Sequence, residues 1–488
     1  MLLFTAVFST ANKSFVADLF TLNRGAKRKY MSTATRSQNL TPKRALTGKL
    51  FLQSICVMLA LVLPTQQAFA ISLIRDAETE RFIRVISEPI FISAGLNPRA
   101  VNTYLINASS INAFVTGGQN VFMHTGTLQQ AETPNEVLGV MAHETGHITG
   151  GHLSGRREAF ENAAAPAIVG YLLGIGAIVA GAGDVGLALI TGGQTVAQRG
   201  FLAYTRTQEA SADQAALDFL ERTGQSGEGL VSFFDKLADQ EALSERSQDP
   251  YVRTHPLSRE RIAALQNRVD KSPFRDVKDP EEWQRMLDMV KAKLHGFIDR
   301  PQVTFRRYPE SDQSAPARYA RAIAHYKIPN TDRAIAEIDA LIADYPDNAY
   351  FQEFKGQALF ESGRSAEAAE AYAAADRLLP NQPLLMVGLG QALVGTGDKA
   401  NVTKAREILE RATQIERDYP TAFRILAQAY ADEGNQPMAA LATAEQNVAS
   451  GRLPDAKQWA SRAKRGLPVG SPAWQRADDI SRIENPDI

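Results

Sequence analysis

Two histidines one helical turn apart mark the place in the chain where metal chemistry is expected. His143, Glu144 and His147 form the pattern His-Glu-x-x-His. Residues four apart on a helix share a face, so both imidazoles can bind the same ion. Neutral imidazole nitrogens suit Zn²⁺, and a catalytic zinc site has three protein ligands and one water. Glu144 is placed to take a proton from that water. The pattern therefore predicts hydrolysis assisted by one zinc ion, with Glu144 as the catalytic acid/base.

The helix that carries this motif has clear start and stop signals. Thr133 can cap it, Pro134 suits its first turn, and Glu136 completes a Ser/Thr-x-x-Glu capping box. Gly150 and Gly151 can end it. The alternative interpretation is an ordinary helix with two solvent-exposed histidines. An apolar opposite face favours the catalytic interpretation; that face carries Val137, Leu138, Val140 and Met141.

A second amphipathic helix, expected over residues 201–222, offers the third ligand. Glu209 and Asp213 are four residues apart and share one of its faces. Two acids on a helix face are usually only solvated. Two histidines, however, need a third protein ligand, and His₂Glu is a common catalytic zinc set. We therefore expect Glu209 to bind the metal and Asp213 to orient a ligand histidine.

Two further histidines have to be weighed as site residues. His152 follows His147 by five residues, whereas the metzincin pattern places its third histidine six residues on. The offset would turn a helical side chain by about 100°, so we rank His152 below Glu209. His255 precedes Pro256 in a loop able to return over the metal. It can stabilise the oxyanion of the tetrahedral intermediate, or it can occupy the open zinc position and silence the enzyme.

Three motifs together resemble the HtpX-like and CAAX-prenyl-protease-like gluzincin metallopeptidases. The resemblance is to their exported branch, in which tetratricopeptide repeats follow the peptidase domain, and it covers roughly residues 71–470. The middle of the second motif lacks a usual second acid, and the chain lacks the several clear membrane spans of the embedded relatives. The motifs are His143-Glu-Thr-Gly-His147, Glu209-Ala-Ser-Ala-Asp213 and Thr254-His255-Pro256-Leu-Ser-Arg259.

This resemblance implies roles for the same residues. The zinc ligands are His143, His147 and Glu209, and Glu144 is the catalytic acid/base. Asp213 matches the acid that closes a Glu-x-x-x-Asp motif. His255 matches a histidine that can hold the fourth position of zinc in a resting, self-inhibited state.

Short β-type runs precede the zinc helix. They cover residues 103–107, 113–116 and 121–124, and the sequence Gly-Gly-Gln-Asn joins the last two as a hairpin. Such a small sheet can offer an edge to an extended peptide. His124 is expected to be a solvated strand residue. A helix over residues 75–88 precedes these strands, and Pro89 should end or kink it.

The second half of the chain is repetitive. Pro346 and Pro380 are 34 residues apart, which is the tetratricopeptide period, and small and aromatic residues recur between them. We expect a peptidase domain over residues 71–299, a linker over 300–316, repeats over 317–470 and a tail over 471–488. The fold class is α+β and mostly helical, with a small sheet in the peptidase domain and an α-solenoid after it. His325 falls on a repeat packing position.

The N-terminal 70 residues have the pattern of an export signal. A basic stretch ends at Lys49, an apolar run follows to Leu63, and Ala68-x-Ala70 fits cleavage after Ala70. Met31 would give a signal of more usual length, and a mitochondrial transit peptide is the alternative. Cys56, the only cysteine, lies inside the signal, so cysteine catalysis is excluded.

The distribution of charge and of apolar residues indicates which classes of partner the protein can bind. Residues 1–70 hold nine Lys/Arg and one Asp, which leaves 44 basic and 53 acidic residues in the remainder. A mildly acidic mature chain argues against nucleic acid as a partner. From Asn162 to Gly183 the chain carries no charge. We expect residues 162–193 to form a buried or membrane-contacting helical hairpin, with a true membrane span as the alternative.

These observations predict an exported zinc endopeptidase of the periplasm. The resemblance implies quality control of outer-membrane protein assembly, with repeats that bind misfolded or stalled protein clients or the assembly machinery. The alternative is a chaperone or adaptor that acts through its repeats, with proteolysis weak or held off by His255.

Overall fold

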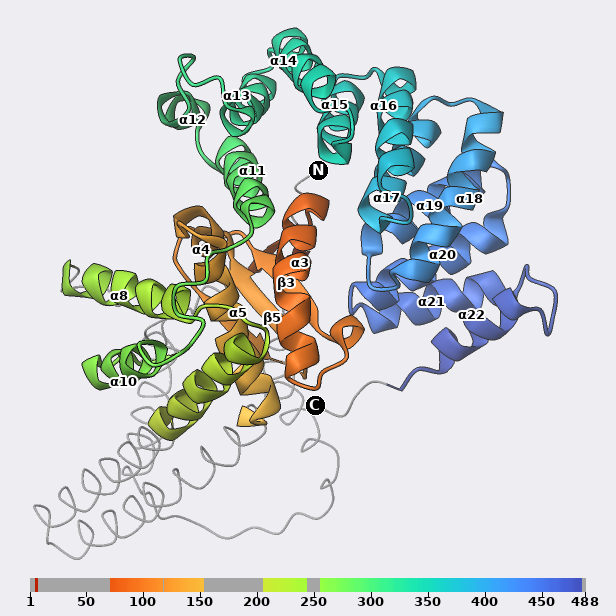
Figure 1. Cartoon of the computed structure of the whole chain (residues 1–488). Helices are drawn as coiled ribbons and strands as arrows, with labels where there is room; N and C mark the ends of the chain where they lie inside the picture. Colours follow the sequence, from red (N-terminus) through yellow and green to blue (C-terminus); the bar gives the residue numbers. More distant parts are fainter. Residues whose placement is uncertain (1–4, 8–70, 117, 153–204, 244–254, 485–488) are drawn as a thin grey trace, which may run out of the picture. The chain divides into compact units, whose positions relative to one another are not determined.

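The computed structural model describes residues 5–7, 71–116, 118–152, 205–243 and 255–484 (Figure 1). Residues 5–72 form a unit separate from the bulk of the chain. Apart from the short strand β1 (Thr5–Val7), the predicted signal lies outside the described residues, and so does the apolar stretch 162–193. Among the helices that are described, none has the length and hydrophobicity needed to cross a bilayer.

A small sheet opens the peptidase domain. Strands β2 (Ile71–Ile74) and β3 (Asn102–Ile106) are antiparallel, and β4 (Ala113–Thr116) and β5 (Asn120–His124) form the predicted hairpin. Strand β3 pairs with β5 in parallel, with Thr103 opposite Val121, so the order is β2-β3-β5-β4. The alternation of residue types indicated the strands but not this parallel pairing.

Helices form most of the rest of the described peptidase domain. They include α3 (Ala77–Ser93), α4 (Thr125–Gln130), α5 (Pro134–Thr149), a helix over residues 205–222, α8 (Glu228–Leu243), α10 (Arg259–Val269) and α11 (Glu281–Ile298). Inward strand residues such as Leu105 and Met123 share one hydrophobic core with Phe82 of α3 and Met141 of α5. Helix α3 does not end at Pro89, because the buried Ile90 and Phe91 hold its last turn against that core.

The zinc-motif helix α5 is buried along almost its whole length, from Pro134 to His147. Thr133 caps its N-terminus, as predicted: the Thr133 hydroxyl accepts a hydrogen bond from the backbone N–H of Glu136. Two glycines let other helices approach closely. A Cβ at Gly139 would lie 2.8 Å from backbone atoms of Leu230, and one at Gly146 would lie 2.7 Å from the Ala212 carbonyl oxygen. Helix α5 is therefore clamped between α8 and the helix over 205–222.

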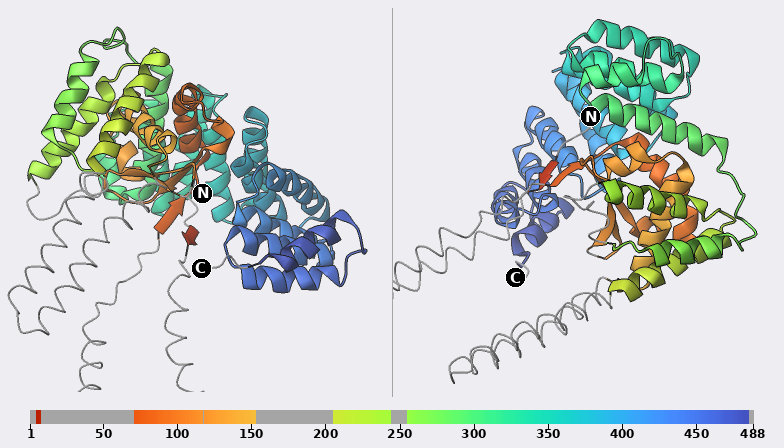
Figure 2. Two further views of the ribbon diagram at one scale, coloured as in Figure 1. Left: turned by 90° about the horizontal axis from the view of Figure 1, so that it is seen from below. Right: turned by 90° about the vertical axis from the view of Figure 1, so that its left-hand side faces the viewer.

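Five helix pairs stack in the second half of the chain, which confirms the repeat prediction (Figure 2). Small residues on one helix leave room for an aromatic side chain of the paired helix. A Cβ at Gly356, for example, would lie 2.7 Å from the ring of Tyr372. The pairs are α13 (Ala315–Lys327) with α14 (Thr331–Asp344), α15 (Ala349–Glu361) with α16 (Ser365–Leu378), α17 (Pro383–Gly395) with α18 (Lys399–Ile415), α19 (Pro420–Asp432) with α20 (Gln436–Ala449), and α21 (Leu453–Lys464) with α22 (Pro472–Arg482).

Two segments differ from the sequence prediction. The expected linker over 300–316 contains helix α12 (Pro301–Arg307), which is tied down where Thr304 donates to the His295 carbonyl at 3.0 Å. The expected tail over 471–488 contains α22, whose Trp474 and Ile480 complete the last hydrophobic cluster. Helix α12 lies before the first helix pair, so the repeat signal could not indicate it, whereas α22 is the second helix of the last pair and extends the repeats beyond residue 470.

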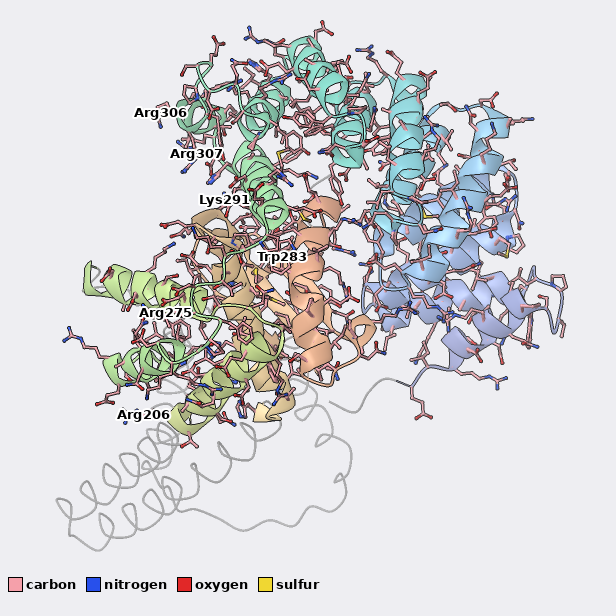
Figure 3. The ribbon with its side chains drawn as sticks, viewed as in Figure 1. Arg206, Arg275, Trp283, Lys291, Arg306 and Arg307 are labelled. Carbon is pink, nitrogen blue, oxygen red and sulfur yellow. The ribbon has the colours of Figure 1, made fainter. Side chains whose placement is uncertain are left out.

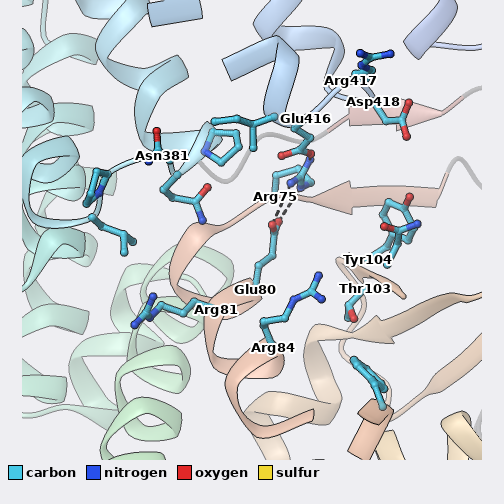
Figure 4. A pocket seen from close by; sticks show the side chains of 17 residues that line it. Arg75, Glu80, Arg81, Arg84, Thr103, Tyr104, Asn381, Glu416, Arg417 and Asp418 are labelled. Carbon is cyan, nitrogen blue, oxygen red and sulfur yellow. Dashed lines mark hydrogen bonds and ion pairs between the residues drawn. The ribbon is translucent and has the colours of Figure 1, made fainter. Parts of the chain in front are cut away.

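Helix α11 contacts the rest of the peptidase domain, and Arg75 contacts the repeats. Trp283 of α11 packs on the peptidase core, and Lys291 of the same helix donates to the Ala131 carbonyl at 2.5 Å (Figure 3). Arg75, just before α3, pairs with Glu80 at 2.7 Å and with Glu416 of the repeats (Figure 4). These residues line a pocket of about 560 Å³.

Candidate metal centre

Four buried side chains that the sequence singled out converge beside α5. His143 and His147 come from α5, Glu209 from the helix over 205–222, and His255 from the residues before α10. Each offers one ligand atom, and these atoms all lie within 4.8 Å of one another. Residues more than 100 positions apart in sequence are thus brought to one point.

The distances between the ligand atoms suit one metal ion. His143 Nε2 lies 3.1 Å from His147 Nε2 and 3.3 Å from Glu209 Oε2. His147 Nε2 lies 3.5 Å from Glu209 Oε1. Tetrahedral ligands at about 2.0–2.2 Å from zinc are about 3.3–3.6 Å apart, so little movement is needed to bind the ion.

Glu144 is fully buried beside this cluster. Neither of its carboxylate oxygens has a hydrogen-bond partner among the described residues, and the nearest basic nitrogen is His255 Nε2 at 3.6 Å. A buried carboxylate without a hydrogen bond costs about 1–3 kcal/mol or more. A water held on a metal would satisfy it, so the residues present fit a catalytic ion.

Asp213 contacts the ring of His143 on the side away from the ligand cluster. Its Oδ1 lies 3.0 Å from His143 Nδ1. Burial would raise the pKa of Asp213, but hydrogen bonds from His143 and Arg261 outweigh it and lower the pKa. Burial alone would likewise lower the pKa of His143, yet Asp213 and Glu209 raise it to about 9. Metal binding must therefore displace a proton from His143.

The other two ligands already have the protonation states that a metal needs. Burial lowers the pKa of His147 to about 4, so its imidazole is neutral. Burial would raise the pKa of Glu209, but electrostatic attraction to His255 and hydrogen bonds from the two α5 histidines lower it far below its usual value. A neutral imidazole and a carboxylate are the forms that bind zinc.

Arg261 is a site residue that the sequence did not indicate. It is buried, and its guanidinium contacts Asp213 through two nitrogens, Nε to Oδ2 at 2.8 Å and Nη2 to Oδ1 at 2.9 Å. Its Nη1 donates to the Pro256 carbonyl at 2.7 Å. The third sequence motif ends at Arg259, which is exposed, and nothing in the sequence points to Arg261 two residues later.

The remaining histidines lie outside the cluster. His124 is half-buried at the end of β5, and its Nδ1 lies 2.9 Å from Ser110 Oγ. His152 lies behind His147, with the Nδ1 atoms of the two rings 2.9 Å apart. His325 packs on the ring of Phe305 in α12, with 4.9 Å between the ring centroids.

Sequence comparison assigns this site to a known class. Residues 76–269 match peptidase family M48, and residues 319–383 match the tetratricopeptide repeat. The chain thus contains a peptidase M48 domain followed by C-terminal tetratricopeptide repeats, and the resemblance indicated by the three motifs is confirmed. The fold class, α+β and mostly helical with a repeat solenoid, is confirmed as well.

The β-barrel assembly-enhancing proteases are similar to this chain over most of its length. The protein of Escherichia coli (strain K12) is 28% identical over 413 residues, which is 83% of each chain. That of Yersinia pestis is 26% identical over 410 residues, with the same coverage. Among solved structures, one described as MamA MSR-1 C2 matches with a TM-score of 0.30 and 19% identity, over 34% of this chain and 95% of that chain.

Proposed function

We propose that this protein is an exported zinc endopeptidase that holds one ion per chain. His143, His147 and Glu209 would bind the zinc. The observation that carries the proposal is the buried carboxylate of Glu144, which lies beside the ligand cluster without a hydrogen-bond partner among the described residues. A site of this kind is completed by a metal and its water.

The residues divide the chemistry between them. Zinc, when bound, polarises the scissile carbonyl and lowers the pKa of water. Glu144 accepts the proton of that water and delivers it to the leaving amine. Asp213 holds the His143 ring through Nδ1, so that its Nε2 faces the ligand cluster.

For His255, the geometry favours the resting, self-inhibited arrangement. Its Nδ1 lies 3.0 Å from Glu209 Oε2 and 3.3 Å from His143 Nε2, within the ligand cluster itself. Its Nε2 lies 3.6 Å from Glu144. In this position His255 would take the fourth place around the metal, and the water that satisfies Glu144 would enter only when His255 moves away. Peptide cleavage then requires His255 to move away, after which it is free to stabilise the oxyanion.

Other features of the chain support the proposed clients and the proposed compartment. The export signal predicted in residues 1–70 supports a periplasmic protein. The similar β-barrel assembly-enhancing proteases support a role in the quality control of outer-membrane protein assembly. The stacked repeats after the peptidase domain give a surface for misfolded or stalled clients or for the assembly machinery. Membrane contact through residues 162–193 stays a prediction.

The substitution Glu144→Gln tests the enzyme. It should leave about one zinc per chain in the purified protein and reduce casein cleavage by about 10²–10⁴-fold, because only the proton transfer is removed. Glu132→Gln, an exposed residue just before α5, is the matched control and should cut normally. If the wild type binds no zinc, the metal proposal fails. If Glu144→Gln retains full cellular function, the chaperone or adaptor role is favoured instead.

A further inference from the structure

The two ligand histidines of α5 are supported by different groups. His143 presents its Nδ1 to the carboxylate of Asp213 at 3.0 Å. His147 presents its Nδ1 to another imidazole nitrogen, His152 Nδ1, at 2.9 Å. All four side chains are buried. The partner of His147 is therefore an imidazole rather than a carboxylate, and the metal mechanism above makes no use of it.

The backbone brings His152 to this position by a turn rather than by helical register. Helix α5 ends at Thr149 and is followed by its cap residue Gly150, and Gly151 has φ +63°, a left-handed conformation that favours glycine. This turn directs the chain back over the end of α5. The five-residue spacing, which argues against His152 as a helical zinc ligand, is thus compatible with a place behind His147.

Three contacts hold the His152 ring and its backbone. A Cβ at Gly150 would lie 2.4 Å from His152 Nε2, so the ring packs where only glycine leaves room. The ring meets His147 edge to face, with 5.0 Å between centroids. Gln208, the neighbour of the ligand Glu209, donates to the His152 carbonyl at 3.3 Å. The position of His152 is therefore tied to both ligand helices.

The role of His152 can be inferred from the hydrogen-bonding needs of a metal-bound His147 ring. When Nε2 of His147 binds a metal, its ring proton is on Nδ1, and a buried N–H needs an acceptor. The Nδ1 of His152 lies at hydrogen-bonding distance and accepts when its own proton is on Nε2. We propose that His152 is a positioning residue that accepts this hydrogen bond and so fixes the tautomer and orientation of His147 for zinc. The inference rests on the proposed zinc site.

A pair of substitutions separates the hydrogen bond from the packing of the ring. His152→Phe keeps a ring over Gly150 but removes the acceptor, whereas His152→Asn keeps an acceptor near the position of Nδ1. His124→Phe, in β5 and outside the cluster, is the matched control for loss of a histidine. The readouts are zinc affinity by competition with a chromophoric chelator, thermal unfolding of the zinc-free protein, and ¹⁵N-histidine NMR of the zinc-loaded protein.

We expect His152→Phe to weaken zinc binding by about 10–100-fold while the zinc-free protein unfolds as the wild type does. His152→Asn should recover most of that affinity, and His124→Phe should bind zinc normally. With only seven histidines in the chain, the Nδ1–H signal of His147 can be followed, and it should shift or exchange rapidly in His152→Phe alone.

Two results would overturn the inference. One is wild-type zinc affinity in His152→Phe; the other is an equal loss in His152→Asn and His152→Phe with the fold of His152→Asn intact. Should His152→Phe fail to fold, His152→Asn still decides, because its near-normal affinity is expected only if an acceptor suffices. Absence of zinc binding by the wild type would instead refute the zinc site on which the inference rests.

Discussion

Arg261 Nε lies 2.8 Å from Asp213 Oδ2, while the other oxygen of Asp213 lies 3.0 Å from His143 Nδ1. The same guanidinium donates to the Pro256 carbonyl at 2.7 Å, directly after His255. One buried arginine therefore holds both the carboxylate that orients a metal ligand and the loop that brings His255 to the cluster.

Replacing Arg261 should destabilise the protein strongly. Arg261→Met leaves the buried Asp213 without its bidentate partner, and loss of one member of a buried ion pair typically costs about 3–5 kcal/mol. Lysine should restore only part of this, because it lacks the planar fork. Urea unfolding of the metal-free protein measures the change. The exposed Arg259→Met should stay within about 0.5 kcal/mol of wild type, and equal stability of the two variants would contradict the assignment.

Removing the His255 imidazole should increase peptidase activity. If His255 occupies the fourth metal position in nine-tenths or more of the molecules, His255→Ala should raise casein cleavage by about tenfold or more. Zinc content must be measured beside it, since both proteins should retain the ion on the three remaining ligands. A wild type that cuts well and a variant that does not would show instead that His255 serves the transition state.

Gly146, inside the His-Glu-x-x-His motif, should not tolerate a methyl group. Alanine normally stabilises a helix relative to glycine by about 1 kcal/mol. At Gly146, however, a Cβ would lie 2.7 Å from the backbone oxygen of Ala212, which cannot rotate away. Gly146→Ala should therefore lower both thermal stability and zinc content, because it pushes the Glu209 helix from α5. The exposed Thr149→Ala in the same helix is the control, and an unchanged or more stable Gly146→Ala would refute the clamp.

Local patterns account for the parts of the site and fold that could be predicted. The His-Glu-x-x-His spacing and the cap at Thr133 are properties of one helix, and the need for a third ligand selects Glu209 from the acids of another helix. The repeats recur at a fixed period, so their packing is visible as a pattern of small and aromatic residues.

The remainder depends on contacts between distant segments. The parallel pairing of β3 with β5 is not encoded in the alternation of either strand. Arg261 differs from Arg259 only in what α10 faces after folding. His152 reaches His147 through a glycine turn, which helical spacing does not describe. Pro89 is accommodated because tertiary burial of Ile90 outweighs the missing backbone hydrogen bond.

A second buried charge cluster, away from the metal centre, connects α3 and α11 to the repeat helix α15. Lys293 of α11 lies 2.5 Å from Asp76, 3.2 Å from Glu353 and 3.4 Å from Glu78. Tyr319 also approaches Glu78, at 3.4 Å. Three carboxyl groups thus share one ammonium. Burial outweighs the attraction of Lys293 and, with the charges of Asp76 and Glu353, raises the pKa of Glu78 to about 7.

This cluster should make stability depend on pH. The raised pKa means that folding favours protonated Glu78, so its stabilising contribution is complete below about pH 4.5 and is lost as pH rises through 7. The unfolding free energy should fall by on the order of 3 kcal/mol across this window through Glu78 alone. In Glu78→Gln, urea unfolding from pH 5 to 8 should show a flatter profile and a protein more stable than wild type at pH 8. The exposed Glu282→Gln should follow the wild-type profile, and parallel profiles for Glu78→Gln and wild type would refute the prediction.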